Sequence, residues 1–135
     1  MGLTFVKDLP TPAEIREQFP LADNLAQLKS QKDEEVKKII TGQSSKFLVL
    51  IGPCSADNED AVCDYTNRLA RVQEKTKDKL VIVPRVYTNK PRTTGEGYMG
   101  MVHQPDPEKK PDMFEGILAI RHMHMRVLRE SGFST

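Results

Sequence analysis

Phe47-Leu-Val-Leu-Ile-Gly-Pro-Cys-Ser55 is the stretch of sequence that decides the fold. It begins as a continuous apolar run, and a second run, Leu80-Val-Ile-Val83, follows further along the chain. Continuous apolar runs of this length are typical of parallel strands that are covered on both faces. Because residues 58–75 between the two runs have a helical pattern, the alternation of strand and helix predicts an α/β fold.

The remainder of the chain continues this alternation. We expect strands over about 47–51 and 80–87, and helices over about 58–75 and 111–131. The apolar stripe of the first helix consists of Val62, Tyr65, Leu69 and Val72. Two parallel strands with one crossover cannot close a barrel. We therefore interpret 46–135 as a partial α/β unit, the first part of a larger α/β protein.

The first 45 residues have a different, purely helical pattern. Thr11-Pro-Ala-Glu14 has the spacing of a capping box, with proline at the first helical position, and predicts a short helix to about Gln18. A longer helix is expected from about Leu21 to Ile40, with Gly42 as a left-handed stop. We interpret residues 1–45 as a helical N-terminal extension.

The composition excludes some classes of partner. The 135 residues carry a formal net charge of +1, with a pI near 7.8, so no global charge attracts nucleic acid or an anionic membrane. Neither is expected as a partner. The chain has two cysteines, Cys54 and Cys63, and no apolar segment of the kind found in signal peptides. We expect a cytoplasmic protein with reduced thiols, in which Cys63 is a packing residue.

Chemically useful residues follow both predicted strands. Parallel strands joined by a right-handed crossover present their carboxyl ends on the same side of the sheet, where ligands bind in open sheets and in barrels. Cys54 follows the first strand, and the basic segment 85–94 follows the second. We therefore expect Cys54 and this segment to face one common crevice.

The segment 85–94 combines cations with hydroxyl groups. Arg85, Lys90 and Arg92 can bind phosphate and carboxylate oxygens, and Thr93 and Thr94 can donate further hydrogen bonds. This combination suits a substrate that is both phosphorylated and carboxylated. An ordinary basic surface loop is the alternative. The next residues, 95–110, are rich in glycine, proline and charge, which indicates either a functional or a disordered loop.

Cys54 has three possible roles: a small buried residue, a metal ligand or a nucleophile. A complete metal site needs three or four ligands. His122 and His124 are two residues apart on a predicted helix and cannot share a face, so we expect both to be surface or packing residues. His103 lies in the loop, and no second metal ligand can be named from the sequence.

Several common nucleotide and hydrolase motifs are absent from the sequence. It contains no Gly-x-x-x-x-Gly-Lys-Ser/Thr, no Gly-x-Gly-x-x-Gly after a strand and no Gly-x-Ser-x-Gly. The basic segment therefore belongs to none of these phosphate-binding or nucleophile-bearing loops.

Two motifs together carry a resemblance to a known family. Ile51-Gly-Pro-Cys-Ser55, followed by Pro84-Arg-Val-Tyr-Thr-Asn-Lys-Pro-Arg-Thr-Thr-Gly95, resembles the type I 3-deoxy-D-arabino-heptulosonate 7-phosphate (DAHP) synthases. The likeness runs from about Glu14 to the end of the chain and includes Gln18-Phe-Pro20. The sister enzymes that make an eight-carbon sugar acid phosphate carry Lys-Ala-Asn-Arg-Ser where this chain has Lys90-Pro-Arg-Thr-Thr94.

The resemblance implies a (β/α)8 TIM barrel that condenses phosphoenolpyruvate with erythrose 4-phosphate, using a divalent metal ion. This reaction opens the shikimate route to the aromatic amino acids. The resemblance implies that Cys54 is a metal ligand and that Arg85 and Lys90 bind phosphoenolpyruvate, with Lys90 catalytic and close to the reacting carbons. Arg92 and Thr93 would bind the phosphate of erythrose 4-phosphate.

The chain departs from the family pattern in its length. The family's other metal ligands come from later strands, and none has a counterpart in this sequence. We therefore expect a truncated synthase whose 135 residues alone are inactive, with the barrel incomplete. Exposed strand edges predict a homo-oligomer. The alternative is a non-catalytic, self-associating barrel fragment that at most binds phosphate.

Overall fold

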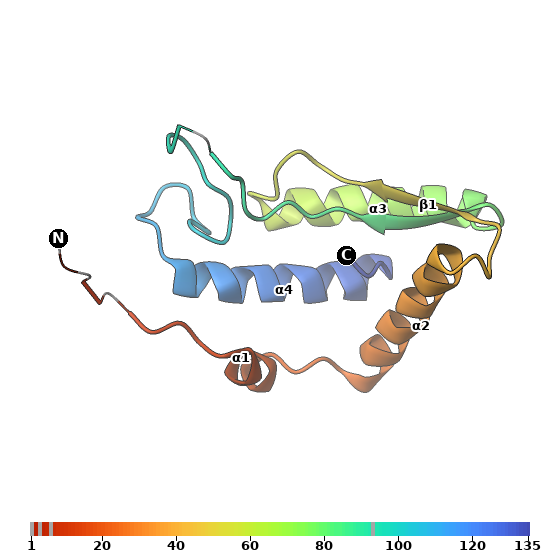
Figure 1. Ribbon diagram of the computed structural model, residues 1–135, viewed down its shortest axis with the longest axis horizontal. Helices are drawn as coiled ribbons and strands as arrows, with labels where there is room; N and C mark the ends of the chain where they lie inside the picture. Colours follow the sequence, from red (N-terminus) through yellow and green to blue (C-terminus); the bar gives the residue numbers. More distant parts are fainter. Residues whose placement is uncertain (1, 3, 6, 93) are drawn as a thin grey trace.

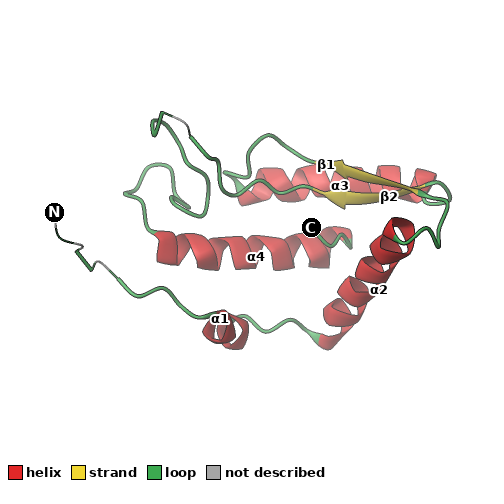
Figure 2. Ribbon diagram, in the orientation of Figure 1, coloured by secondary structure: helices red, strands yellow, loops and turns green. Residues whose placement is uncertain are grey.

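A computed structural model describes residues 2, 4–5, 7–92 and 94–135 as four helices and two strands (Figures 1 and 2). In chain order these are α1 (Pro12–Gln18), α2 (Asp23–Ile40), β1 (Phe47–Ile51), α3 (Glu59–Thr76), β2 (Leu80–Pro84) and α4 (Met113–Ser131). Strand and helix alternate from β1 to α4, as predicted. No described helix is both long enough and apolar enough to span a membrane.

The two strands form a parallel sheet with a register that runs from Phe47 opposite Leu80 to Ile51 opposite Pro84. The second strand is three residues shorter than predicted. One further ladder bond, from Arg85 N to Ile51 O over 2.9 Å, follows Pro84. β1 ends at Ile51 and therefore offers no partner to the residues after Arg85. The strand β2 is for this reason shorter than the strand pattern in the sequence.

The core lies between the sheet and the pair α3 and α4. Val49 and Ile82, which are opposite each other in the register, pack with Val62 of α3 and with Met123 and Val127 of α4. The other face of the sheet carries Leu50 and Val83 and borders a cavity of 320 Å³ that α2 also lines. Helices α3 and α4 therefore cover one face only.

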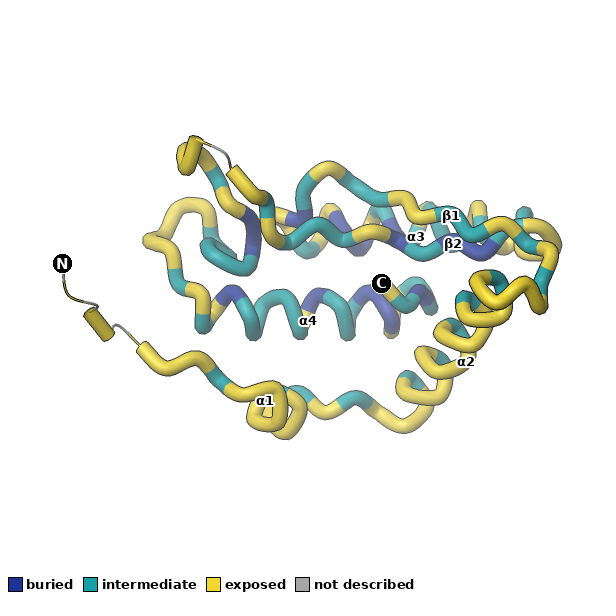
Figure 3. The backbone as a smooth tube through the Cα atoms, viewed as in Figure 1, coloured by how far each residue is buried: buried dark blue, intermediate teal, exposed yellow. Residues whose placement is uncertain are grey.

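Burial differs between the two strands (Figure 3). Val81 and Ile82 point to opposite faces of β2 and are each only 6% exposed, as expected for a strand covered on both faces. In β1 that expectation is wrong, because Phe47 is 73% and Leu50 is 67% exposed. The apolar stripe predicted for α3 is also partly wrong: Val72 is exposed, since no described element covers it.

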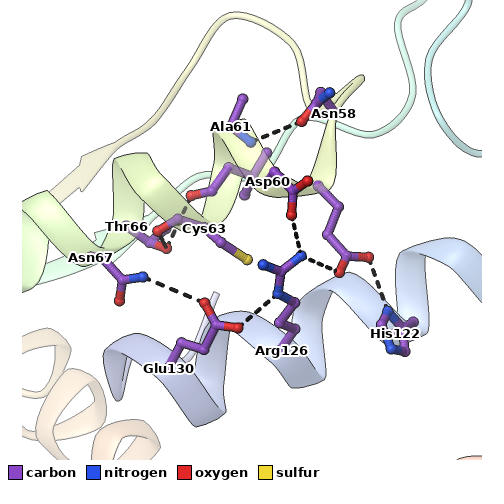
Figure 4. Close-up of polar contacts among 11 residues, drawn as sticks. Asn58, Asp60, Ala61, Cys63, Thr66, Asn67, His122, Arg126 and Glu130 are labelled. Carbon is purple, nitrogen blue, oxygen red and sulfur yellow. Dashed lines mark hydrogen bonds and ion pairs between the residues drawn. The ribbon is translucent and has the colours of Figure 1, made fainter.

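Polar contacts fasten the N-terminus of α3 to α4 (Figure 4). Arg126 of α4 lies between the carboxylates of Glu59 and Asp60 at the start of α3 and that of Glu130 on its own helix, at 2.8, 2.6 and 2.7 Å. His122 Nδ1 contacts the other oxygen of Glu59 at 2.9 Å. The start of α3 is therefore fixed relative to α4.

Helices α1 and α2 occupy the segment predicted as a helical extension. The capping box is present, since Glu14 N donates to Thr11 Oγ1 and Thr11 N donates to the Glu14 carboxylate. Gly42 has a φ of 74°, as expected for a left-handed stop after α2. Neither helix contains a buried residue, and Arg121 of α4 reaches this segment by donating to the Phe19 carbonyl over 3.0 Å.

Candidate functional site at the ends of the two strands

The carboxyl ends of β1 and β2 come into direct backbone contact. A Cβ atom added to Gly52 would lie 1.8 Å from the Arg85 carbonyl oxygen, so only glycine fits there. The Arg85 side chain turns back across the gap, and its Nη2 donates to the Pro53 carbonyl over 3.1 Å. Gly52 therefore sets the distance between the turn that carries Cys54 and the basic segment.

Cys54 and Lys90 come together at this contact. Lys90 Nζ lies 3.7 Å from Cys54 Sγ, although 36 positions separate the two residues. Cys54 is exposed, so its thiol is open to a ligand, whereas Cys63 is buried in the core and burial raises the pKa of its thiol. Next to Cys54, the hydroxyl of Ser55 is buried and has no partner among the described residues.

The two arginines of the basic segment are held by neutral groups. Arg85 lies 4.8 Å from the centre of the Tyr87 ring, and Arg92 donates through Nε and Nη2 to the Tyr98 carbonyl over 3.1 and 3.0 Å. In the described part of the chain no carboxylate pairs with Arg85, Lys90 or Arg92. Three cations without a counter-ion in one segment make a site for an anion. The predicted site residue Thr93 lies outside the described residues.

The loop after the basic segment is folded against it. Lys90 N donates to Met99 O over 2.8 Å, and Val102 N donates to Thr88 O over 3.1 Å. Gly100 has a φ of 107°, and a Cβ there would lie 2.3 Å from the Thr88 carbonyl oxygen. Of the two alternatives for residues 95–110, the described part is thus an ordered loop that supports the basic segment.

Two contributors to this site were not predicted from the sequence. Gly52 acts as a spacer, and Tyr98 supplies the carbonyl that holds Arg92. The glycines at 95, 97 and 100 were a signal for a tightly folded loop, but nothing in the sequence shows which carbonyl Arg92 reaches.

A metal ion would find one clear donor here. Among the described residues no three His, Cys, Asp or Glu side chains form a group that could hold a metal. His103 contacts Asn89 Oδ1 at 3.2 Å, and His122 is engaged with Glu59. Cys54 alone does not meet the three or four ligands of a metal site.

Comparison with known proteins gives the family. The sequence model of the DAHP synthetase I family matches residues 19–117. The Phe-sensitive phospho-2-dehydro-3-deoxyheptonate aldolase of Escherichia coli (strain K12) is 35% identical over 118 residues, which are 87% of this chain and 33% of that protein. The phospho-2-dehydro-3-deoxyheptonate aldolase of Haemophilus influenzae is 40% identical over 94 residues, 70% of this chain and 26% of that protein.

A solved structure agrees with the sequence comparisons. The phospho-2-dehydro-3-deoxyheptonate aldolase of Francisella tularensis superposes with a TM-score of 0.85 at 25% identity, covering 93% of this chain and 37% of that one. The chain spans about a third of the length of the curated relatives it matches. The match to the family model covers most of the chain and contains both strand ends described above, so the chain belongs to the DAHP synthetase I family.

Proposed function

We infer that this chain supplies the first two strand ends of a DAHP synthase site, in which phosphoenolpyruvate condenses with erythrose 4-phosphate and phosphate is released. The observation that carries this proposal is the set of three cations at the end of β2. They have no carboxylate partner in the described part of the chain, and one of them, Lys90, lies beside the exposed thiol of Cys54. The fold to which these strands belong is, on this proposal, a (β/α)8 barrel.

The roles follow from charge and position. Phosphoenolpyruvate carries a phosphate and a carboxylate, which need two cationic groups, and Arg85 and Lys90 are the two nearest to the contact between the strands. Lys90, beside Cys54, is the group closest to the reacting carbons. Arg92 and Thr93 bind the phosphate of erythrose 4-phosphate. Holding two anions that repel each other in attack geometry is how such cations accelerate a condensation.

Cys54 is proposed as one ligand of a divalent metal ion, which would polarise the aldehyde carbonyl when bound. The described residues add no further group of ligands, so the other ligands must come from outside this cluster. We propose on this ground that the 135 residues alone bind anions but do not catalyse the condensation. The pathway is aromatic amino acid biosynthesis.

Titration of the chain with phosphoenolpyruvate tests the proposal. Arg85→Ala should weaken binding about 10- to 100-fold, since a hydrogen bond to a charged group contributes about 1.5–3 kcal/mol. Arg71→Ala, which removes an exposed arginine from α3, is the matched control and should leave the affinity unchanged. Isothermal titration calorimetry with and without Mn²⁺ measures both variants. Equal affinity of Arg85→Ala and the parent chain would contradict the assigned site.

The second candidate is a non-catalytic, self-associating fragment that at most binds phosphate. The exposed apolar residues Phe47 and Leu50 on β1 favour it. The two candidates differ in selectivity, because a fragment that binds only phosphate should take inorganic phosphate as well as phosphoenolpyruvate. Turnover of both substrates by the purified chain would exclude this candidate, and would also contradict the inactivity proposed above.

A further inference from the structure

The Arg92 guanidinium uses one of its edges, Nε–Nη2, in hydrogen bonds within the chain, and its Nη1–Nη2 edge can still bind a ligand. Nε and Nη2 donate to the single carbonyl oxygen of Tyr98, while Nη1 has no hydrogen-bond partner among the described residues. A guanidinium is planar and carries five N–H donors in a rigid fork. Fixing the Nε–Nη2 edge therefore fixes the plane in which the Nη1–Nη2 edge can meet an anion.

This arrangement prepares Arg92 for a phosphate group. Bidentate contact of two N–H groups with phosphate oxygens requires the ligand to lie in the guanidinium plane, at the edge that carries those two groups. Arg92 is exposed, and an exposed arginine without such contacts would sample many rotamers before binding. A donor that is already oriented loses less conformational entropy when its ligand binds. The affinity for phosphate at Arg92 thus depends on what holds the Tyr98 carbonyl.

The Tyr98 carbonyl is held from two sides. On one side, the neighbouring Met99 carbonyl accepts from Lys90 N over 2.8 Å, which ties this part of the loop to the basic segment. On the other side, the Tyr98 hydroxyl donates to the Gln104 carbonyl over 3.1 Å. The side chain of Tyr98 therefore closes the loop whose backbone orients Arg92.

The acceptor of the Tyr98 hydroxyl is itself well anchored. The Gln104 side-chain amide donates to the carbonyls of Pro107 and Lys109 over 3.0 and 2.8 Å, and Gln104 N donates to Gly100 O over 3.1 Å. Burial raises the pKa of Tyr98, and the charge of Asp57 adds to this effect. The hydroxyl therefore stays protonated at neutral pH and remains a donor.

We propose that Tyr98 is a positioning residue: through its hydroxyl bond to Gln104 it holds the carbonyl that directs Arg92 toward a phosphate group. The inference rests on the proposed function in taking phosphate as the ligand of Arg92. It goes further in assigning a role to a side chain that does not itself touch the ligand. Removing only the Tyr98 hydroxyl should weaken phosphate binding while the charge of the site stays the same.

The test uses Tyr98→Phe in the 135-residue chain, with inorganic phosphate as the probe and the Arg92 Nε–H resonance as the reporter. In the parent chain this proton is protected from exchange and its signal shifts on addition of phosphate. In Tyr98→Phe it exchanges faster, and the affinity for phosphate falls about 2- to 10-fold, as for loss of one neutral hydrogen bond. Tyr65→Phe on α3 makes the same chemical change elsewhere and should alter neither quantity.

A double-mutant cycle separates positioning from general loosening of the loop. Lysine at position 92 keeps the charge but cannot make the two-pronged contact with the Tyr98 carbonyl. If Tyr98 acts through Arg92, adding Tyr98→Phe to Arg92→Lys lowers the affinity for phosphate no further. An equal loss in both backgrounds overturns the inference, even where Tyr98→Phe alone weakens binding.

Two other results overturn the inference. One is unchanged phosphate affinity and an unchanged Arg92 signal in Tyr98→Phe; the other is a parent chain in which phosphate leaves the Arg92 signal unmoved. Failure of the proposed function looks different. In that case phosphate still acts at Arg92 and depends on Tyr98, but phosphoenolpyruvate does not bind at Arg85, and the positioning role stands.

Discussion

At the scale of single residues, Gly52 has the clearest physical requirement in the chain. A Cβ on Gly52 would lie 1.8 Å from the carbonyl oxygen and 2.7 Å from the carbonyl carbon of Arg85. Both obstacles are backbone atoms, which cannot move aside as the end of a flexible side chain can. The contact that places Cys54 beside Lys90 therefore depends on the absence of one methyl group.

Gly52→Ala should lower the free energy of unfolding by about 3 kcal/mol or more, because the two strand ends must separate or the backbone must strain. Gly42→Ala is the control, since a Cβ at Gly42 meets nothing within 4 Å and only the φ of 74° opposes it. The backbone strain in Gly42→Ala should lower the free energy of unfolding by about 1–2 kcal/mol. Urea unfolding measures both variants. If Gly52→Ala costs no more than Gly42→Ala, the close approach does not limit the fold.

At the scale of elements, the join between α3 and α4 depends on Glu59 and Arg126. Arg126 reaches three carboxylates, and the cluster raises the pKa of its guanidinium, so Arg126 stays charged. Burial acts to raise the pKa of Glu59, but hydrogen bonds from Arg126 and His122 outweigh it and leave that pKa below its usual 4.5. Because α3 begins shortly after Cys54, this join (Figure 4) anchors the C-terminal end of the segment that carries Cys54.

Glu59→Gln should lower the free energy of unfolding at pH 7 by about 1 kcal/mol, an estimate that allows for screening of a partly exposed pair. A carboxylate whose pKa is lowered by folding stabilises the protein above pH 4.5, and this stability is lost as the pH falls through the folded-state pKa. The difference between Glu59→Gln and the parent chain should therefore shrink below pH 4.5. Thermal unfolding of both proteins over pH 3–7 measures this difference in stability.

The matched control for this prediction is Glu74→Gln. Glu74 lies on the same helix and pairs with Lys77 at 2.9 Å, but both side chains are largely exposed. No measurable loss of stability is expected from it at any pH in the range. If the two variants behave alike, the α3–α4 cluster contributes no more than an ordinary surface pair.

At the scale of the whole molecule, the two-stranded sheet has unpaired edges and exposed apolar side chains. In the described part of the chain β1 pairs with β2 alone, and Phe47 and Leu50 expose most of their apolar surface. Unpaired strand edges with exposed apolar side chains pair readily with another chain. Self-association of this chain is therefore expected, and it stays a prediction.

Phe47→Lys combined with Leu50→Lys should shift the chain from oligomer toward monomer, because charged side chains on an edge strand disfavour pairing. Phe5→Lys is the control, since Phe5 is 85% exposed but belongs to neither strand. Sedimentation velocity over a range of protein concentrations distinguishes the species. A parent chain that sediments as a monomer at all concentrations contradicts the prediction.

Features that depend on near neighbours could be predicted from the sequence, and the structure confirms them. The capping box at Thr11 and the stop at Gly42 rest on contacts within a few residues, and the strand Phe47–Ile51 follows a local run of apolar residues. The alternation of strand and helix is likewise a local pattern. The family could also be identified from the two motifs, and the comparisons confirm it.

Features that depend on remote segments needed the folded chain. The sequence pattern extends the second strand beyond Pro84, but a strand ends where its partner ends, and Ile51 is that end. Likewise, no spacing rule brings Glu59 to Arg126 or Arg121 to the Phe19 carbonyl. Sequence patterns record the preferences of single elements, whereas the site is made by contacts between elements, and those distances exist only once the elements have packed.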